Sequence, residues 1–470
     1  MEGHEALQWP GGPGGEVTVL TARVLRVGGH AYYLDEPGGP PAPRSAAPSG
    51  REVPGRVPAE RRWAGSGAAT LGLVGEVEPV AFAALLRGAH PATGELLGPR
   101  RGVEVGAYDL TFSAPKSVSL LALVGPRELA AVAGDAHRTA VADAVGYVER
   151  AALRARRSHG GHVSLLATGG LVAGAFGHRT SRDLDPHLHT HLVVANVVHG
   201  ADGRWTAVDS RRIFAHVRSA GLVYQASLRA ELTARAGVAW AVSERGLGDV
   251  VGVPAPLRRL YSQRAAAITR YLAAAGEPAG GRPGGEEVRA TRRAAFYVTR
   301  PAKEGLPAAD QLAAEWRARA ADCGFDLGVL GRVVGRARVE GRSGPGDDSG
   351  RAAARLAAFG PERLLARRDV VAVLAASATS GARVGELEQA ADRLLDSCAR
   401  HGRGRTSDER WREPRWPAGV VAEAVTTNGL VLSGERDGAV RGPDRDPSWR
   451  ALVRDGARPG AHRAGADLGR

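Results

Sequence analysis

The chain is poor in cysteine, and this excludes folds that depend on sulfur. Only Cys323 and Cys398 occur among the 470 residues, without CxxC spacing, so neither a disulfide framework nor a zinc ribbon can form. No run of about 18 apolar residues occurs, which argues against a membrane-spanning helix. The first residues lack the basic and apolar regions of a signal peptide. The sequence therefore predicts a globular protein of the reducing cytoplasm.

Lysine is also scarce, although the chain is strongly basic. Lys116 and Lys303 are the only lysines, so arginine supplies nearly all of the 63 basic residues and of the net charge of +13. A guanidinium group pairs two phosphate oxygens at once, which favours a phosphate-rich partner such as nucleic acid. A GC-rich genome raises the arginine content in the same way, so charge alone does not identify the partner.

Composition divides the chain into five segments. Residues 1–15 are rich in Gly and Pro and predict a disordered extension, whereas residues 16–335 carry regular strand and helix patterns and form the main domain. Residues 336–360 are rich in Gly, Ser, Asp and Arg and predict a linker. Residues 361–400 predict a small helical segment, and residues 401–470 are expected to be mostly disordered.

Within the main domain, strand and helix patterns follow one another. Strands are expected at residues 108–113, 163–176, 188–198 and 205–208, with a hairpin at 240–251. Helices are expected at residues 128–156, from 210 to Gly237, and near 256–275 and 307–321. Residues 114–117 should open a further helix, because Pro is favoured in a first turn. The order is typical of a mixed α and β fold.

Four histidines occur within fourteen residues, from His178 to His191. Successive side chains of a strand face opposite sides, so His189 and His191 should project to one side about 7 Å apart. His178 can reach them from an adjacent strand across a turn-rich segment. Three neutral imidazoles suit a metal such as Zn²⁺ or Mn²⁺ and leave positions open for a substrate oxygen. The cluster therefore predicts a metal site; His187 extends the row, but its spacing alone does not make it a ligand.

Two further groups of residues are candidates on weaker patterns. Asp109 lies on the polar face of its expected strand, where a carboxylate can orient a histidine ligand or hold a tyrosine proton; the sequence alone favours a solvent-facing strand residue. Lys116 and Ser117 open a helix, where backbone N–H groups and positive charge can bind phosphate. The chain contains no GxxxxGK[ST] motif, so no nucleotide-driven motor is predicted.

Tyrosine is uncommon in this chain, and two of the eight tyrosines are adjacent, at Tyr32 and Tyr33. A phenolate can attack phosphorus when a nearby cation or base lowers the cost of deprotonation. A tyrosine pair taken alone is more often part of a core or an interface. Neighbouring strand residues face opposite ways, so only one of the two should point at a shared site.

Four blocks of sequence, in the same order, resemble the relaxase domain of TrwC/MobF-type conjugative relaxases over about residues 17–325. They are residues 19–21 with Tyr32 and Tyr33 after them, residues 67–77, residues 109–117 and residues 178–191. The resemblance implies an α+β fold of HUH type, in which helices pack on one face of a palm-like antiparallel sheet and the open face holds metal and DNA. It also implies roles for individual residues: Tyr32, or its neighbour Tyr33, as nucleophile, His178, His189 and His191 as metal ligands, Asp109 as their supporting carboxylate, and Lys116, Ser117, Arg179 and Arg182 as contacts to DNA phosphates.

The activity implied by the resemblance is site- and strand-specific nicking of DNA at a conjugative transfer origin, with strand transfer through a 5′-phosphotyrosyl intermediate. The implied cofactor is a divalent metal ion, Mg²⁺, Mn²⁺ or Zn²⁺. The implied partners are transfer-origin DNA, as duplex and single strand, accessory relaxosome proteins, and a coupling protein or a separate helicase, without membrane insertion.

The sequence departs from the family pattern in two respects, and other hypotheses stay open. Some relatives carry a second tyrosine pair, whereas only Tyr32 and Tyr33 occur in this segment. The family often continues into a helicase, whereas this chain stops after residues 367–394, which resemble the beginning of one. The alternatives are a rolling-circle replication initiator of the same chemistry, a three-histidine metal hydrolase acting on small molecules, and a non-catalytic DNA-binding remnant.

Overall fold

The computed structural model describes most of the chain between residues 20 and 428. The described ranges are residues 20–27, 60–98, 104–160, 162–276, 295, 298–299, 307–339, 345–400, 406–408 and 413–428. Tyr32 and Tyr33 lie outside them, as do the extension expected at residues 1–15 and the last forty or so residues, so the expectations for those segments stay predictions. No helix in the described ranges has the length and apolar character needed to cross a membrane.

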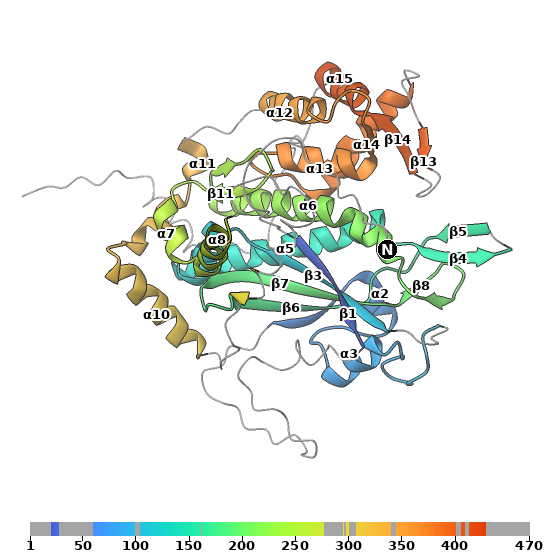
Figure 1. Cartoon of the computed structure of the whole chain (residues 1–470), viewed down its shortest axis with the longest axis horizontal. Helices are drawn as coiled ribbons and strands as arrows, with labels where there is room; N and C mark the ends of the chain where they lie inside the picture. The colour runs from blue at the N-terminus through green and yellow to red at the C-terminus, as the bar shows by residue number, and fades with distance from the viewer. Residues whose placement is uncertain are drawn as a thin grey trace, which may run out of the picture.

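A five-stranded antiparallel sheet forms the centre of the fold (Figure 1). Its strands, in spatial order, are β1 (Leu20–Arg26), β3 (Val105–Ser113), β7 (Pro186–Ala195), β6 (Ala173–Thr180) and β2 (Arg61–Ala64). Thr111 pairs with His191, and His178 pairs with His189. Because side chains alternate along each strand, Leu110 of β3 and Leu192 of β7 face the main core, while the residues beside them face the other side.

Two long helices cover the first face of this sheet, as Figure 1 shows. They are α5 (Arg127–Ala151) and α6 (Ser210–Ala236), and the short α4 (Lys116–Leu123) follows β3 directly. Val141, Val145 and Val148 form an apolar stripe on α5, and all three are buried. Helix α6 ends at Gly237, whose φ of 63° is the left-handed cap that glycine adopts readily. The predicted palm-like sheet with helices on one face is confirmed.

The second face of the sheet is covered over part of its length. Helix α2 (Ser66–Thr70) and helix α3 (Pro79–Leu86) lie on this side, and Phe82 and Leu86 of α3 form an apolar cluster with Phe176 and Val193. The rings of Phe82 and Phe176 meet edge to face with centroids 5.1 Å apart. The histidines of β6 and β7 lie on this same face, beyond the cluster.

Two of the expected element boundaries are wrong. The strand expected at residues 163–176 is two elements, β5 (His162–Leu166) and β6, because Gly170 has a φ of 106° and interrupts the extended chain. The helix expected to reach residue 156 ends at Ala151, and the chain continues as β4 (Ala155–His159), which pairs with β5. Tertiary pairing has overridden the helical propensity of this Ala- and Arg-rich segment.

Smaller elements complete the main domain. They are the pair β8 (Val198–His199) and β9 (Trp205–Thr206), the pair β10 (Trp240–Val242) and β11 (Gly248–Val250), the helices α7 (Ala255–Leu260), α8 (Gln263–Ala274), α10 (Ala309–Asp322) and α11 (Arg336–Val339), and the 3-10 turn η1 (Leu327–Val333). The hairpin expected at 240–251 is confirmed. The helix expected near 256–275 is two helices, since Tyr261 and Ser262 separate α7 from α8.

The prediction of a linker at residues 336–360 is also wrong. It contains α12 (Pro345–Ala357), which buries Ala352 and Leu356 in the main core. Beyond it lie α13 (Arg367–Ser377), α14 (Val384–Arg400), α15 (Ala418–Asn428) and a small sheet of β12 (Leu364–Ala366), β14 (Glu413–Pro417) and β13 (Thr406–Asp408). These elements pack on the side of α6 away from the sheet (Figure 1).

One fully buried arginine joins this C-terminal part to the main domain. Arg229 of α6 donates to the carbonyl oxygens of Ala375 and Ala378 at the end of α13, at 2.8 and 3.0 Å, and to Gly246 at 3.0 Å. Burial lowers the pKa of Arg229 to about 9. The guanidinium thereby occupies carbonyls that the last turn of α13 would otherwise leave unpaired.

Candidate metal centre

His178, His189 and His191 lie together on the second face of the sheet. The centroids of their rings are 5.1 to 5.2 Å apart in all three pairs. Three imidazoles that bind one ion tetrahedrally, with metal–nitrogen distances near 2.1 Å, have centroids about 5.3 Å apart. The spacing of the three rings therefore suits a single metal ion. The expectation that His178 reaches the other two from an adjacent strand is confirmed by its pairing with His189.

The ring orientations, unlike the ring spacing, are not those of a filled metal site. The rings of His178 and His189 stack with an angle of 19° between their planes. Among the described residues, no three histidine, cysteine or carboxylate side chains already have their donor atoms in the arrangement of a filled metal site.

Asp109 fixes the orientation of His191. Both carboxylate oxygens of Asp109 lie 3.0 Å from Nδ1 of His191, and the Thr111 hydroxyl donates to Oδ1 of Asp109 at 3.1 Å. An Nδ1–H that donates to a carboxylate leaves the lone pair of the ring on Nε2, the nitrogen that then binds metal. The Asp109 side chain is only 3% exposed, so the solvent-facing position that the sequence alone favoured is wrong.

A contact to the backbone orients His189. Its Nδ1 lies 3.0 Å from the carbonyl oxygen of His187, so its Nε2 is also the nitrogen directed to a ligand. Burial, together with the neighbouring histidines, lowers the pKa of His189 well below its usual value. The ring is therefore neutral near pH 7, which is the state that binds a metal ion.

His187 continues the row, and Lys116 lies beside it. The His187 ring is 4.6 Å from that of His189, and burial followed by the charge of Lys116 lowers the pKa of His187 to about 4. Lys116 donates to the carbonyl oxygen of Pro186 at 2.7 Å. Burial lowers the pKa of Lys116 to about 8, an effect that Asp185 partly offsets.

The other residues expected to contact phosphate lie in different surroundings. Ser117 is fully buried; its hydroxyl donates to Asp249 at 2.7 Å and accepts from the backbone N–H of Val250 at 3.0 Å. This side chain therefore joins α4 to β11, and its burial leaves it inaccessible to a DNA phosphate. Arg179, at the end of β6, is exposed, and Arg182 in the following turn is half-buried.

The turn between β6 and β7 is held in place by helices α8 and α10, which are distant from it in sequence. Asp185, 1% exposed, accepts hydrogen bonds from the backbone and side chain of Gln263, at 2.8 and 2.7 Å, and from Arg319 at 3.0 Å. The indole N–H of Trp316 donates to the carbonyl oxygen of Leu184 at 2.7 Å. The partners lie 78 to 134 residues away in sequence, so no local signal pointed to them. These bonds fix the hairpin that carries His178 and His189.

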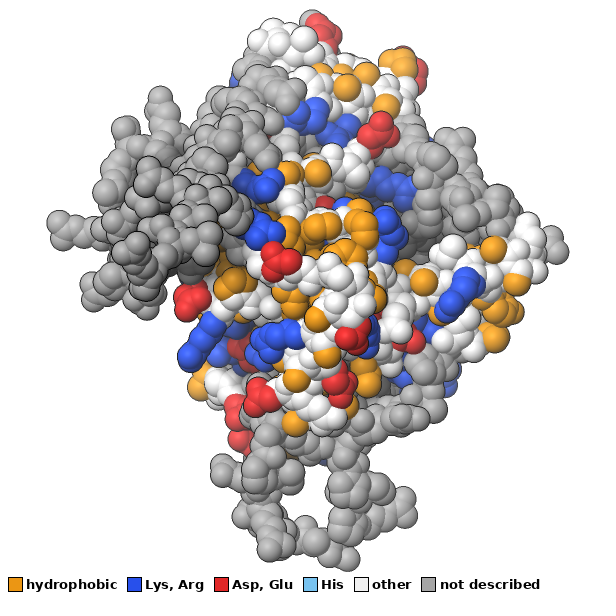
Figure 2. Space-filling view, turned by 90° about the vertical axis from the view of Figure 1, so that its left-hand side faces the viewer, with side chains coloured by type: hydrophobic (Ala, Val, Ile, Leu, Met, Phe, Trp, Pro, Cys, Tyr) orange, Lys and Arg blue, Asp and Glu red, His pale blue; other side chains and the backbone are white. Residues whose placement is uncertain are grey.

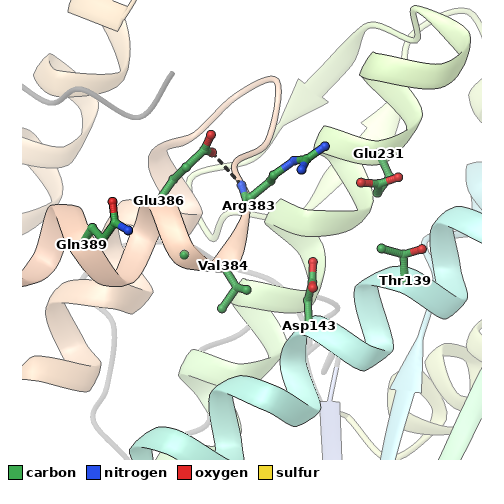
Figure 3. A pocket seen from close by; sticks show the side chains of 8 residues that line it. Thr139, Asp143, Glu231, Arg383, Val384, Glu386 and Gln389 are labelled. Carbon is green, nitrogen blue, oxygen red and sulfur yellow. Dashed lines mark hydrogen bonds between the residues drawn. The ribbon is translucent and has the colours of Figure 1, made fainter. Parts of the chain in front are cut away.

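One cavity among the described residues lies apart from the histidines. A cavity of about 420 Å³ lies between α5, α6 and the start of α14, and its lining includes the carboxylates of Asp143, Glu231 and Glu386 (Figure 3). Its acidic side chains outnumber its one basic side chain, Arg383, which disfavours an anionic ligand. Figure 2 shows a face on which Lys and Arg side chains surround an apolar area and alternate with acidic groups, so the basic residues there do not form one continuous patch.

Comparison with known proteins identifies the family. Residues 55–323 match the family model of the TrwC relaxase. The chain belongs to this family of conjugative relaxases.

Individual relatives agree with this assignment. The chain is 36% identical over 277 residues to the multifunctional conjugation protein TraI of Escherichia coli, and 34% identical to TraI of strain K12. The matched region is 57% of this chain but 15% of each TraI protein, so the chain spans a small part of the length of these relatives.

Solved structures give the same result. A metal-bound complex of the conjugative relaxase TrwC with oriT DNA is 33% identical, with a TM-score of 0.55, over 66% of this chain and 99% of that one. A copper-bound TrwC complex matches equally well.

Proposed function

We propose that this chain nicks one DNA strand at a conjugative transfer origin and transfers that strand through a 5′-phosphotyrosyl intermediate. The observation that carries the proposal is the group of three histidines, supported by Asp109, on the sheet face of a TrwC-family relaxase. The solved TrwC relaxase is a complex with oriT DNA. A rolling-circle initiator would use the same chemistry, but the family match favours conjugation.

His178, His189 and His191 are the residues that would hold a divalent metal ion, with Nε2 of His189 and His191 as donors. A bound divalent ion supplies positive charge that stabilises a phosphate as negative charge builds on its oxygens. The donor set is entirely imidazole, which favours Mn²⁺ or Zn²⁺ over Mg²⁺. Asp109 holds the His191 ring in one tautomer throughout, and burial keeps His189 neutral.

The reaction itself is an exchange of one phosphodiester for another. The phenolate oxygen of Tyr32, or of Tyr33, forms a bond to phosphorus, and the bond from phosphorus to the 3′ oxygen breaks. The 3′ oxygen takes up a proton as it leaves, in place of the proton that the phenol lost. The bond count is unchanged, so rejoining is the same step in reverse and requires no ATP.

The ribbon formed by β4 and β5 is a candidate surface for duplex DNA. It projects from the edge of the molecule (Figure 1), and its exposed residues include Arg156, His159 and His162. A two-stranded ribbon fits the major groove of B-form DNA. Arg157 is held in the fold by a bidentate pair with Asp202, with both distances 2.7 Å. This leaves Arg156 as the arginine of the ribbon directed outwards.

The test is a search for the covalent adduct. The full chain is incubated with Mn²⁺ and supercoiled plasmid carrying the transfer origin of its own element, then denatured and examined for protein attached to DNA. We expect an adduct that disappears with a chelator and in either Tyr32→Phe or Tyr33→Phe, whichever removes the nucleophile.

The alternatives give different results. A metal hydrolase acting on small molecules would form no adduct, and both tyrosine variants would keep its activity. A non-catalytic remnant would bind the DNA without nicking it. An adduct that forms equally well in the double variant Tyr32→Phe/Tyr33→Phe would refute the proposed nucleophile.

A further inference from the structure

Strand β7 presents Thr190 to the helical layer from the position between His189 and His191. Thr190 is buried, and its hydroxyl oxygen lies 2.9 Å from Nε2 of His137 on α5. His137 is 2% exposed, and its Nδ1 lies 2.8 Å from the hydroxyl of Tyr224 on α6, which is fully buried. Three side chains thus form one hydrogen-bonded series from α6 through α5 to the strand that carries two of the histidines.

Every polar group in this series has a partner. Burial lowers the pKa of His137 to about 3, so the ring is neutral and has one donor and one acceptor nitrogen. The hydroxyls of Thr190 and Tyr224 can each donate or accept, and both bonds therefore form in either tautomer. The ring of Tyr224 also packs against Phe112 of β3, with centroids 5.5 Å apart. The series therefore joins both helices to β7 and packs against β3.

The position of Thr190 matters more than the energy of its bond. Apolar side chains of similar volume would fill this space at little cost in stability, because a buried polar network gains little over well-packed apolar groups. A hydrogen bond, unlike an apolar contact, fixes direction. Any displacement of Thr190 along or across β7 moves His189 and His191 with it, since they are its immediate neighbours.

We propose that the series Thr190, His137 and Tyr224 is a positioning device that sets the placement of His189 and His191 for metal binding. This inference rests on the proposed metal site and adds three residues that do not themselves contact the metal. It acts from the core side of the sheet, whereas Asp109 acts from the same side as the ligands.

A matched control lies in the same helical layer. The hydroxyl of Tyr147 on α5 donates to Ser219 on α6 at 3.0 Å, and both residues are buried. This bond joins the same two helices but involves no residue of β7. Tyr147→Phe therefore removes a buried hydroxyl comparable to that removed by Tyr224→Phe, without changing the series that ends at Thr190.

The experiment measures Co²⁺ binding to the full chain by calorimetry and by the visible absorption spectrum, which reports the coordination geometry. We expect Thr190→Val and Tyr224→Phe to weaken Co²⁺ binding about 3- to 10-fold, less than the loss usual for residues bonded directly to a ligand, and to alter the spectrum. Tyr147→Phe should leave both unchanged. His137→Gln, which keeps a donor and an acceptor, should bind Co²⁺ more tightly than His137→Leu.

Melting temperatures separate positioning from general stability. If Tyr224→Phe and Tyr147→Phe lower the melting temperature alike and leave Co²⁺ binding equal, the series is only structural and the inference is wrong. If the wild-type chain binds Co²⁺ and Thr190→Val binds it equally tightly, the inference fails while the proposed function stands. If the wild-type chain binds no Co²⁺, the proposed metal site fails and the inference fails with it.

Discussion

Replacing Asp109 with Asn tests the link between this carboxylate and the metal centre. The substitution keeps the shape of the side chain and one acceptor oxygen, but it removes the negative charge that faces Nδ1 of His191 at 3.0 Å from both oxygens. A hydrogen bond to a charged group contributes roughly 1.5 to 3 kcal/mol, and a neutral one about 1 kcal/mol. The difference, roughly 0.5 to 2 kcal/mol, predicts a loss of about 1.3 kcal/mol in the free energy of metal binding.

The expected change in affinity follows from this free energy. A loss of about 1.4 kcal/mol is a factor of ten, so Asp109→Asn should raise the dissociation constant for Mn²⁺ about tenfold. Asp109→Ala, which leaves the buried N–H of His191 without this acceptor, should raise it further, about 100-fold. Thr111→Val removes a hydroxyl that donates to Asp109 at 3.1 Å and lies 2.9 Å from Nδ1 of His191. It should raise the dissociation constant by about fivefold or less, because the direct contact between Asp109 and His191 remains.

Calorimetric titration of the full chain with Mn²⁺ measures the three constants, and adduct formation is followed in parallel. The order Thr111→Val, Asp109→Asn, Asp109→Ala should appear in both measurements. An Asp109→Asn variant that binds Mn²⁺ as tightly as the wild type but forms no adduct would refute this reasoning. The carboxylate would then act on the proton of the tyrosine and not through His191.

Further predictions concern stability and DNA binding. The pKa of His137 is about 3 in the folded chain and 6.5 in the unfolded chain, so its contribution to stability is complete above pH 6.5 and is lost as pH falls towards 3. Between pH 7 and pH 5, the free energy of unfolding measured in urea should therefore fall by about 2 kcal/mol more in wild type than in His137→Gln. Arg229→Met leaves buried carbonyls unpaired and should cost about 3 kcal/mol in the free energy of unfolding, whereas Arg235→Met on the same helix, 41% exposed, should cost less than about 1 kcal/mol; equal losses would contradict the role given to Arg229. Affinity for transfer-origin duplex should fall steeply with salt, and Arg156→Ala should reduce the logarithmic salt slope by about one; an unchanged slope would exclude Arg156 as a phosphate contact.

Alternation of side chains was enough to predict the centre of the candidate site. The placement of His189 and His191 on one face follows from the period of two along a strand, and His178 joins them because a hairpin brings β6 beside β7. The position of Asp109 on this face was predicted as well. Its burial was not, because burial depends on which strand pairs with β3, and the sequence does not reveal strand order.

Contacts between distant segments were beyond local patterns. His137 is buried with both ring nitrogens bonded, and its partners lie 53 and 87 residues away in sequence. Composition alone predicted a linker at residues 336–360, but both Asp residues of this segment lie within α12, whose apolar residues pack in a core formed by other elements. The roles of Tyr32 and Tyr33 stay predictions.

The alternation along β7 also bears on how the molecule can misfold. A slip of one residue in its pairing would turn His189 and His191 into the apolar layer beneath α5 and α6, and would turn Leu192 and Val194 out of that layer. A chain with this slipped pairing would therefore lose its apolar core and its metal-binding histidines together. Folded molecules in a preparation should therefore all be competent to bind metal, so that a titration of metal sites also counts the folded chains.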